Sequence, residues 1–226
     1  MRYENIRPAI FLNRPNRFIA NIRLDGNAVA CHVKNTGRCR ELLLPGARVL
    51  VQMSGAAGRK TSCDLIAVWK GSRLVNMDAQ APNRVFGEWL SGGGLGVTPG
   101  LIRPECTHGD SRFDFYFEAN GRRAFAEIKG VTLEEEGVAR FPDAPTERGV
   151  KHLHGLIRAV SEGYAAYAVF IIQMRGVTRF GPNWAVHPAF GHALQKAQAA
   201  GVRVLALDCD VTENSLAIHA PVQVEL

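Results

Sequence analysis

Residues 112–129 constrain the fold most, because they read as a β-hairpin whose register can be derived. The segment Arg112–Glu118 alternates polar and apolar side chains, as a half-buried strand does. Asn120-Gly121 then supplies the dipeptide that a type I′ turn prefers, since both of its central residues take positive φ. A two-residue turn fixes the pairing of the strands around it, so we expect Asp114 to lie opposite Glu127.

The same register sorts the hairpin side chains onto two faces. On one face, three phenylalanines are expected to pack in a core opposite small or aliphatic residues: Phe117, Phe115 and Phe113 opposite Ala124, Ala126 and Ile128. The other face is expected to be polar, and it carries Arg112, Asp114, Tyr116, Glu127 and Lys129. The chemistry of the hairpin is therefore expected on this second face.

The polar face brings two carboxylates together, Asp114 and Glu127, with Cβ atoms about 5 Å apart in this register. Adjacent carboxylates repel each other unless a cation joins them, and Mg²⁺, or Mn²⁺ in its place, meets that need. Lys129 lies beside Arg112, where it can orient or deprotonate an attacking water or stabilise charge on a phosphorane. The alternative is a solvated strand face of alternating charges, which the Asp-x12-Glu-x-Lys spacing by itself does not exclude.

A run of short strands in the first third of the chain predicts a small closed barrel. Asp25-Gly26 separates two apolar-rich segments as a hairpin turn does. Five strands are expected over residues 16–24, 27–33, 47–53, 61–69 and 73–77, with turns over 45–46, over 55–58 and at Gly71. An OB-fold, which commonly binds nucleic acid, is the leading candidate. An SH3-like barrel would produce nearly the same string.

After Ala81-Pro82 the pattern changes, so we expect one domain over residues 1–81 and a second over residues 82–226. Helices are expected over residues 83–90, 146–163 and 188–200, and strands over 112–118, 123–129, 165–174 and 203–208. The glycine-rich residues 91–100 are expected to be a flexible loop. Strands alternating with helices around an initial hairpin predict a mixed α/β domain, in which helices flank a mixed sheet.

The positive charge of the chain is concentrated in the first domain. Residues 1–81 hold 13 Lys and Arg against 5 Asp and Glu, a net charge of +8, and the remainder holds 14 against 16, a net charge of −2. A domain with this bias commonly meets a polyanion, most often nucleic acid, although a basic solvated surface gives the same count. The residues expected to line a phosphate groove are Arg14, Arg17, Lys34 and Arg38, joined by Arg112 on the hairpin.

Five cysteines are scattered along the chain without a Cys-x-x-Cys pair. This pattern favours free thiols in a reducing compartment over a zinc site or a disulfide framework. No window approaches the ~18–20 uninterrupted apolar residues of a membrane helix, and the first residues lack the apolar core of a secretory signal. We therefore expect a cytoplasmic protein that does not engage a membrane.

The helix expected over residues 146–163 offers further candidates. Lys151 is a candidate phosphate contact if it faces the hairpin, and it is otherwise a solvated lysine. His152 and His154 are two residues apart and do not share a helix face, which excludes them as a zinc pair. The acidic run Glu134-Glu135-Glu136 is expected to be a solvated loop.

The hairpin pattern resembles the PD-(D/E)XK nuclease-like core, in which a preceding helix often adds a glutamate. That resemblance implies a role for Glu88, on the helix expected over residues 83–90. The whole chain resembles the sugar fermentation stimulation protein A family. The segments that carry this second resemblance are residues 11–18, 32–38, 41–46, 59–60, 109–114, 127–133 and 141–153.

The family resemblance implies an OB-like domain joined to a PD-(D/E)XK-like domain, DNA binding and regulation of sugar metabolism. Three functions are then open: a Mg²⁺-dependent nuclease acting on DNA, a DNA-binding regulator with a silent nuclease-like domain, and an RNA-binding or RNA-processing protein. The intact Asp114, Glu127 and Lys129 favour the nuclease over the silent domain, because a purely structural domain has no need to place two carboxylates together. No basic recognition helix is visible, so we expect weak sequence specificity.

Overall fold

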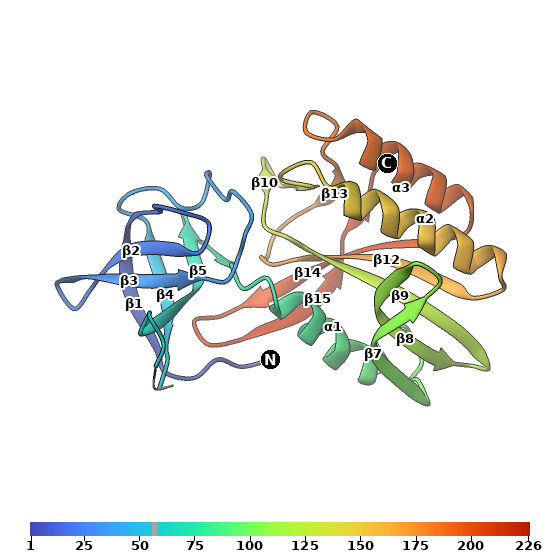
Figure 1. The fold of residues 1–226 in the computed structure, drawn as a ribbon, viewed down its shortest axis with the longest axis horizontal. Helices are drawn as coiled ribbons and strands as arrows, with labels where there is room; N and C mark the ends of the chain where they lie inside the picture. The colour runs from blue at the N-terminus through green and yellow to red at the C-terminus, as the bar shows by residue number, and fades with distance from the viewer. Residues whose placement is uncertain (56–57) are drawn as a thin grey trace.

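The computed structural model describes residues 1–55 and 58–226, and Figure 1 shows them as two lobes. The first lobe is a β-barrel, and the second is a six-stranded mixed sheet with helices packed on it, which confirms the expected α/β class. The turn expected over residues 55–58 includes two residues outside the described ones. No helix in the described part of the chain is long and apolar enough to span a membrane.

The barrel contains one more strand than the sequence predicts. Its strands are β1 (Ile6–Asn13), β2 (Ile19–Leu24), β3 (Asn27–Val33), β4 (Arg48–Met53), β5 (Cys63–Lys70) and β6 (Arg73–Asn76). They pair in the order β3-β2-β1-β4-β5-β6, and a parallel β3–β5 pairing closes five of them into a barrel. The overlooked strand is β1, which contains Pro8 and therefore lacks one ladder donor. The barrel tolerates it because β1 pairs with β2 only from Ile10 onward.

The second lobe begins at α1 (Ala81–Ser91), directly after the barrel. Its main strands are β7 (Leu101–His108), β8 (Ser111–Ala119), β9 (Arg122–Val131), β12 (Ala165–Ile172), β14 (Arg203–Val211) and β15 (Leu216–Pro221), paired in the order β15-β14-β12-β9-β8-β7. Strands β9, β12 and β14 are parallel and the others antiparallel. A small second sheet contains β10 (Glu134–Glu135), β11 (Val138–Phe141), β13 (Arg179–Pro182) and β16 (Gln223–Val224).

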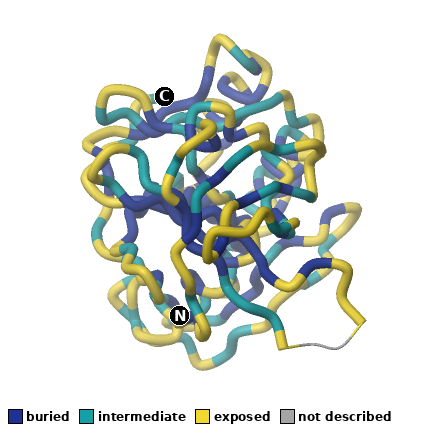
Figure 2. Tube along the Cα trace, turned by 90° about the vertical axis from the view of Figure 1, so that its left-hand side faces the viewer, coloured by how far each residue is buried: buried dark blue, intermediate teal, exposed yellow. Residues whose placement is uncertain are grey.

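Helices cover both faces of the main sheet, so its central strands are buried, as the dark segments inside Figure 2 show. The helices α2 (Glu147–Ser161) and α3 (Pro188–Ala199) pack together on one face, and α1 packs on the other. The apolar stripe expected on α2 is present, with Leu153 buried at its centre. The expected division of the chain after residue 81 stays a prediction.

The register predicted for the hairpin is confirmed over its five pairs from Ala119↔Arg122 to Phe115↔Ala126. The turn residues Asn120 and Gly121 have φ of 51° and 71°, as a type I′ turn requires. The recorded pairing stops there, one position before Asp114 and Glu127 would oppose each other.

The prediction for the hairpin faces is wrong at one aromatic residue, Phe113. Phe115 and Phe117 lie on the α1 side, as expected of a common face, but Phe113 packs on the α2 side with its ring centroid 5.2 Å from that of Phe125. Tyr116 lies opposite Phe125 on the α2 side, the face expected to carry it, and it is buried there. The alternation changes at Asp114, beyond the last recorded β8–β9 pair at Phe115, and α2 covers the polar face.

A buried ion cluster joins the two lobes. The Glu134 carboxylate of β10 accepts from Lys70 Nζ at 2.7 Å and lies 2.9 Å from an Arg73 guanidinium nitrogen, and both cations belong to the barrel. Burial by itself raises the pKa of Glu134, but hydrogen bonds from these cations and from the Gly137 N–H hold it below its ordinary value. The prediction that this residue lies in a solvated loop is therefore wrong. The Glu134 carboxylate is buried because it pairs with Lys70 and Arg73 of the barrel.

Candidate functional site

Glu127 lies in the middle of the second lobe, on the buried strand β9. Only 4% of its surface is exposed. One carboxylate oxygen, Oε1, accepts from Lys129 Nζ at 2.5 Å and also contacts His152 Nδ1. The other oxygen, Oε2, is buried and has no hydrogen-bond partner among the residues that the structure describes. A buried carboxylate oxygen without a donor is costly, and a bound cation is one way to satisfy it.

Asp114 is held beside Glu127 by the irregularity in β8. Its Oδ2 accepts from the backbone N–H of Ile128 at 2.7 Å, and its Oδ1 accepts from Asn83 Nδ2 at 2.8 Å. The Asp114 carboxylate thus accepts a hydrogen bond from the β9 backbone beyond Phe115, where the backbone pairing of β8 with β9 ends. Asn83 belongs to α1, so the helix before the hairpin does contribute to this site.

The two carboxylates influence each other electrostatically. Burial, followed by the charge of Glu127, raises the pKa of Asp114 above its ordinary value. Burial also acts to raise the pKa of Glu127, but the hydrogen bond from His152 and the charge of Lys129 outweigh it and leave that pKa lowered. A second negative charge on Asp114 is therefore opposed, and a divalent cation between the groups would relieve the repulsion.

These donors fit a hard divalent ion, because both carboxylates supply oxygen and Glu127 Oε2 has no other partner. Asp114 and Glu127 are the residues that would hold it. The described residues contain no cluster of three or more His, Cys, Asp or Glu side chains with metal-binding geometry. The remaining ligands would therefore be water, backbone or substrate oxygens.

Two residues of this site, His152 and Asn83, were not among the predicted ones. His152 is buried on α2 and contacts Glu127 across 25 positions of sequence, and its Nε2 lies 3.4 Å from Arg148 Nε. The sequence excluded His152 as half of a zinc pair and gave it no other role. A histidine facing inward at the start of an amphipathic helix was the only available signal.

The structure places Glu88 away from this carboxylate pair. Its carboxylate binds the N-terminal amino group of Met1 at 2.6 Å and lies 3.5 Å from Arg84 Nε. Asn83 is five residues earlier on α1, about 140° around the helix, and it is the residue that reaches Asp114. The prediction that Glu88 approaches the hairpin is therefore wrong, and the α1 residue that contacts Asp114 is Asn83.

Two predicted cations also lie elsewhere. Lys151 is exposed on α2 and pairs with Asp110 at 3.5 Å, because its neighbour His152 takes the inward position. Arg112 is exposed and forms an ion pair with Glu105 of β7. Of the five predicted catalytic residues, the structure brings together Asp114, Glu127 and Lys129.

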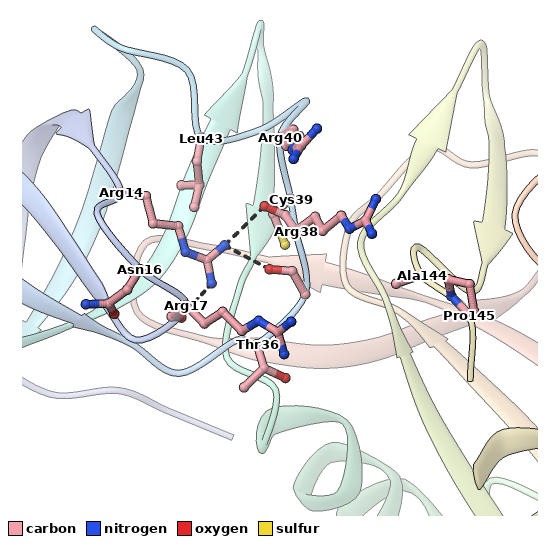
Figure 3. A pocket seen from close by; sticks show the side chains of 11 residues that line it. Arg14, Asn16, Arg17, Thr36, Arg38, Cys39, Arg40, Leu43, Ala144 and Pro145 are labelled. Atoms are coloured by element: carbon pink, nitrogen blue, oxygen red, sulfur yellow. Dashed lines mark hydrogen bonds between the residues drawn. The ribbon is translucent and has the colours of Figure 1, made fainter. Parts of the chain in front are cut away.

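A second candidate site lies where the barrel faces the second lobe. It is a pocket of about 600 Å³, and Figure 3 shows Arg14, Arg17, Arg38 and Arg40 of the barrel around it. Its lining residues are Arg14, Asn16, Arg17, Thr36, Gly37, Arg38, Cys39, Arg40, Leu43, Ala144 and Pro145. The last two come from the second lobe, directly before α2. The backbone N–H of Arg38 also donates to Asp143 Oδ2 at 3.0 Å, which ties the pocket loop to that lobe.

The predicted groove residues divide into engaged and free cations. The Arg14 guanidinium donates to four backbone carbonyls, those of Arg17, Asn35, Gly37 and Arg38, at 2.6 to 3.1 Å. Figure 3 shows the bonds to the carbonyls of the pocket residues, and the buried Nε of Arg14 has no partner among the described residues. Lys34 is largely buried between Asp64 and Asp78, at 3.8 and 3.4 Å. Arg17 and Arg38 are exposed, and no ion pair to either is found among the described residues. Arg40, which was not predicted, is exposed in the same way.

Comparison with known proteins identifies the family. A family model described as "Sugar fermentation stimulation protein RE domain" matches residues 80–215, and one described as "SfsA N-terminal OB domain" matches residues 12–77. A sugar fermentation stimulation protein homolog of Desulfitobacterium hafniense is 59% identical over 216 residues, 96% of this chain and 94% of the relative. A homolog of Clostridium beijerinckii is 51% identical over 226 residues, covering both chains fully. This chain belongs to the sugar fermentation stimulation protein family.

A solved structure of the family agrees with the fold. The SfsA protein of Pyrococcus furiosus, determined in complex with Ca²⁺, is 28% identical and superposes with a TM-score of 0.89 over 100% of this chain and 98% of its own. The OB match confirms the predicted barrel type over the SH3-like alternative. Within the sugar fermentation stimulation protein family architecture, the carboxylate pair lies in the RE domain. The arginines of the pocket lie in the OB domain.

Proposed function

We propose that this protein is a Mg²⁺- or Mn²⁺-dependent phosphodiesterase that cleaves DNA with Asp114, Glu127 and Lys129. The observation that carries the proposal is the buried, unpartnered Oε2 of Glu127 next to a second carboxylate and a lysine. The family member from Pyrococcus furiosus was determined with Ca²⁺, an ion that prefers the same oxygen ligands, and this supports a divalent cation here.

Each residue has a distinct part in such a reaction. A divalent ion, when bound, would supply Lewis acidity for the scissile phosphate and for the attacking water. Asp114 and Glu127 would hold the ion, and Asn83, the Ile128 N–H and His152 fix the orientation of those carboxylates. Lys129 carries a positive charge at the same place and stabilises the negative charge that develops on the phosphorane.

The barrel supplies the second half of the function, because its free arginines can hold the phosphate backbone. Arg17 and Arg38 contact phosphates without reading bases, so binding is expected to be strongly salt-dependent and weakly sequence-specific. The pocket wall formed by Ala144 and Pro145 continues directly into α2, which carries His152 to Glu127. One short segment therefore connects the basic pocket to the carboxylates.

The test pairs cleavage with binding in the same purified protein. Glu127→Gln should abolish cleavage with Mg²⁺ or Mn²⁺, because a neutral amide cannot hold the cation. Lys129→Ala should abolish cleavage but leave metal binding largely intact, since an ammonium donates and does not ligate. DNA affinity, measured with Ca²⁺ in place of Mg²⁺, should survive in both variants because the barrel supplies most of the contact.

A second function, a DNA-binding regulator with a silent nuclease-like domain, is favoured by one observation. The arginine pocket lies mostly in the OB domain and does not depend on the carboxylates. If the wild-type protein and both variants show the same low cleavage while DNA binding persists, the regulator replaces the nuclease. Cleavage of RNA but not DNA under these conditions would instead assign the same site to RNA processing.

A further inference from the structure

Arg148 is the cation that α2 carries on the same face as His152. The two residues are four positions apart, and side chains with that spacing are neighbours on a helix surface. Arg148 Nε donates to His152 Nε2 at 3.4 Å, and His152 Nδ1 contacts Glu127 Oε1. A single imidazole ring therefore separates the Arg148 guanidinium from a carboxylate that would hold the divalent ion.

Most of this guanidinium is not used by the fold. Arg148 is exposed, and the contact with His152 is the only polar contact that it makes in the described part of the chain. Its two terminal nitrogens therefore keep their N–H donors without a protein partner. A planar guanidinium with free donors can bind phosphate oxygens through two parallel hydrogen bonds.

The position of Arg148 does not stabilise the helix. The residue lies in the first turn of α2, where the helix dipole opposes a positive charge. Lys151 and Arg158, on the same helix, are instead paired with Asp110. Arg148 is therefore free to bind a ligand in a way that the other two cations are not.

The other basic groups expected at the carboxylate site already have carboxylate partners. Lys129 Nζ donates to Glu127 Oε1 at 2.5 Å, and Arg112 pairs with Glu105. A phosphodiester next to two carboxylates and their cation keeps a negative oxygen on its far side, and a further cation close by stabilises that charge. Arg148 supplies a cation at this place.

We propose that Arg148 is the phosphate-binding residue of the carboxylate site and contacts an oxygen of the phosphodiester there. This inference rests on the proposed function, because it assigns a substrate contact to the site of Asp114 and Glu127. It also changes which residue of α2 is expected to contact phosphate. Lys151 was the predicted one, and Arg148 is the cation on the face toward Glu127.

The experiment measures DNA affinity of the full-length protein by fluorescence anisotropy at one salt concentration, with Ca²⁺ and with a chelator in its place. The probe is a short fluorescein-labelled duplex with a single-stranded overhang, which offers both strand states. The variants are Arg148→Ala, Arg148→Lys and, as the matched control, Arg158→Ala on the same helix. Calorimetry measures the Ca²⁺ affinity of each protein without DNA.

Ca²⁺ should strengthen DNA binding by the wild type, because the ion offsets the repulsion between phosphate and the carboxylates. Arg148→Ala should weaken binding with Ca²⁺ by about 10- to 100-fold, the loss expected for a charge-assisted contact. With the chelator its binding should be nearly unchanged, because phosphate is then not held at the carboxylates. Arg148→Lys should keep part of the affinity, since an ammonium keeps the charge but not the paired donors. Arg158→Ala should match the wild type under both conditions.

The Ca²⁺ affinity without DNA should be the same in Arg148→Ala and the wild type. This measurement separates a phosphate contact from an effect through His152, which contacts Glu127 and would alter metal binding. Because Arg148 is exposed, the variants are expected to fold.

Three results would overturn the inference. Wild-type DNA affinity in Arg148→Ala with Ca²⁺ removes the contact. An equal loss with Ca²⁺ and with the chelator shows a general electrostatic contribution, and a loss of Ca²⁺ affinity without DNA shows that Arg148 acts through His152. These results leave the proposed function standing, provided that Ca²⁺ strengthens DNA binding by the wild type. If Ca²⁺ neither binds the wild type nor changes its DNA affinity, the proposed cation site itself fails.

Discussion

The basic barrel and the carboxylate site of the hairpin differ in how their charged side chains relate to the rest of the fold. In the barrel, Arg14 donates to four carbonyls, although its buried Nε has no partner, while Arg17, three positions away, is exposed and has no ion pair among the described residues. In the hairpin, Glu127 is buried and partly satisfied, but one of its oxygens has no partner. Charge alone therefore does not show whether a side chain holds the fold together or is open to a ligand.

The two regions also differ in which parts of the fold supply the residues around them. The arginine pocket is assembled mainly from two loops of the same barrel, with Ala144 and Pro145 as its outer wall. The carboxylate site takes Asn83 from α1 and His152 from α2, on opposite faces of the sheet. Its geometry therefore depends on the packing of the whole second lobe, whereas the pocket depends on local turns and one arginine.

Single substitutions test whether Arg14 stabilises the fold while Arg17 is free to bind DNA. Arg14→Ala should lower the free energy of unfolding by about 3 kcal/mol, because it leaves carbonyls of two loops without their charged donor. Arg17→Ala should leave stability unchanged. It should weaken DNA binding and reduce the slope of log affinity against log salt by about 1.

Urea unfolding and salt titrations of DNA binding measure these two effects, with Arg23→Ala, an exposed arginine elsewhere on the barrel, as the control. Equal stability in Arg14→Ala and Arg17→Ala would show that the distinction between engaged and free arginines is wrong.

The dependence of the hairpin on distant helices predicts an effect of His152. His152→Ala should weaken Ca²⁺ binding by about 10- to 100-fold, the usual consequence of removing a group that orients a metal ligand. His154→Ala, an exposed position on the same helix, should bind Ca²⁺ like the wild type. Titration calorimetry measures the affinities. Unchanged Ca²⁺ affinity in His152→Ala, in a folded protein, would remove His152 from the site.

Substitution of Asp64 in the barrel is expected to have the smallest effect on stability, and that effect should depend on pH. Burial acts to raise its pKa, but Arg59, His32 and Lys34 outweigh burial and hold the pKa below its ordinary value. Its stabilising contribution is therefore present above the ordinary aspartate range and is lost as pH falls toward the lowered value. Asp64→Asn should lower stability at pH 7 by about 1 to 2 kcal/mol, and the difference from wild type should shrink below about pH 4.

Thermal unfolding at several pH values checks this, with Asp25→Asn as the control. Asp25 pairs with Arg7 on the surface, where an ion pair contributes about 0 to 1 kcal/mol. A difference between Asp64→Asn and wild type that stays constant down to pH 3 would show that the charge of Asp64 is not what stabilises the barrel.

The sequence determined those features that depend on neighbours in the chain. Asn120-Gly121 and Asp25-Gly26 fixed their hairpins, because positive φ is required at adjacent positions and few residues accept it. The alternating pattern located the buried strands, and the spacing of three or four located the face of α2 around Leu153. Placing Asp114 and Glu127 near each other followed from the same local rules.

Tertiary structure decided which side chains are satisfied, since that depends on partners far away in the chain. Arg14 and Arg17 look alike in sequence, and only the fold of the loop around Gly37 makes one structural and leaves the other free. The choice of Asn83 over Glu88 depended on which side of α1 faces the sheet, and the role of His152 on how α2 covers β9. A sequence pattern shows which chemical group a residue supplies. Packing decides whether that group keeps its water or finds partners in the fold, and therefore whether it is free to act.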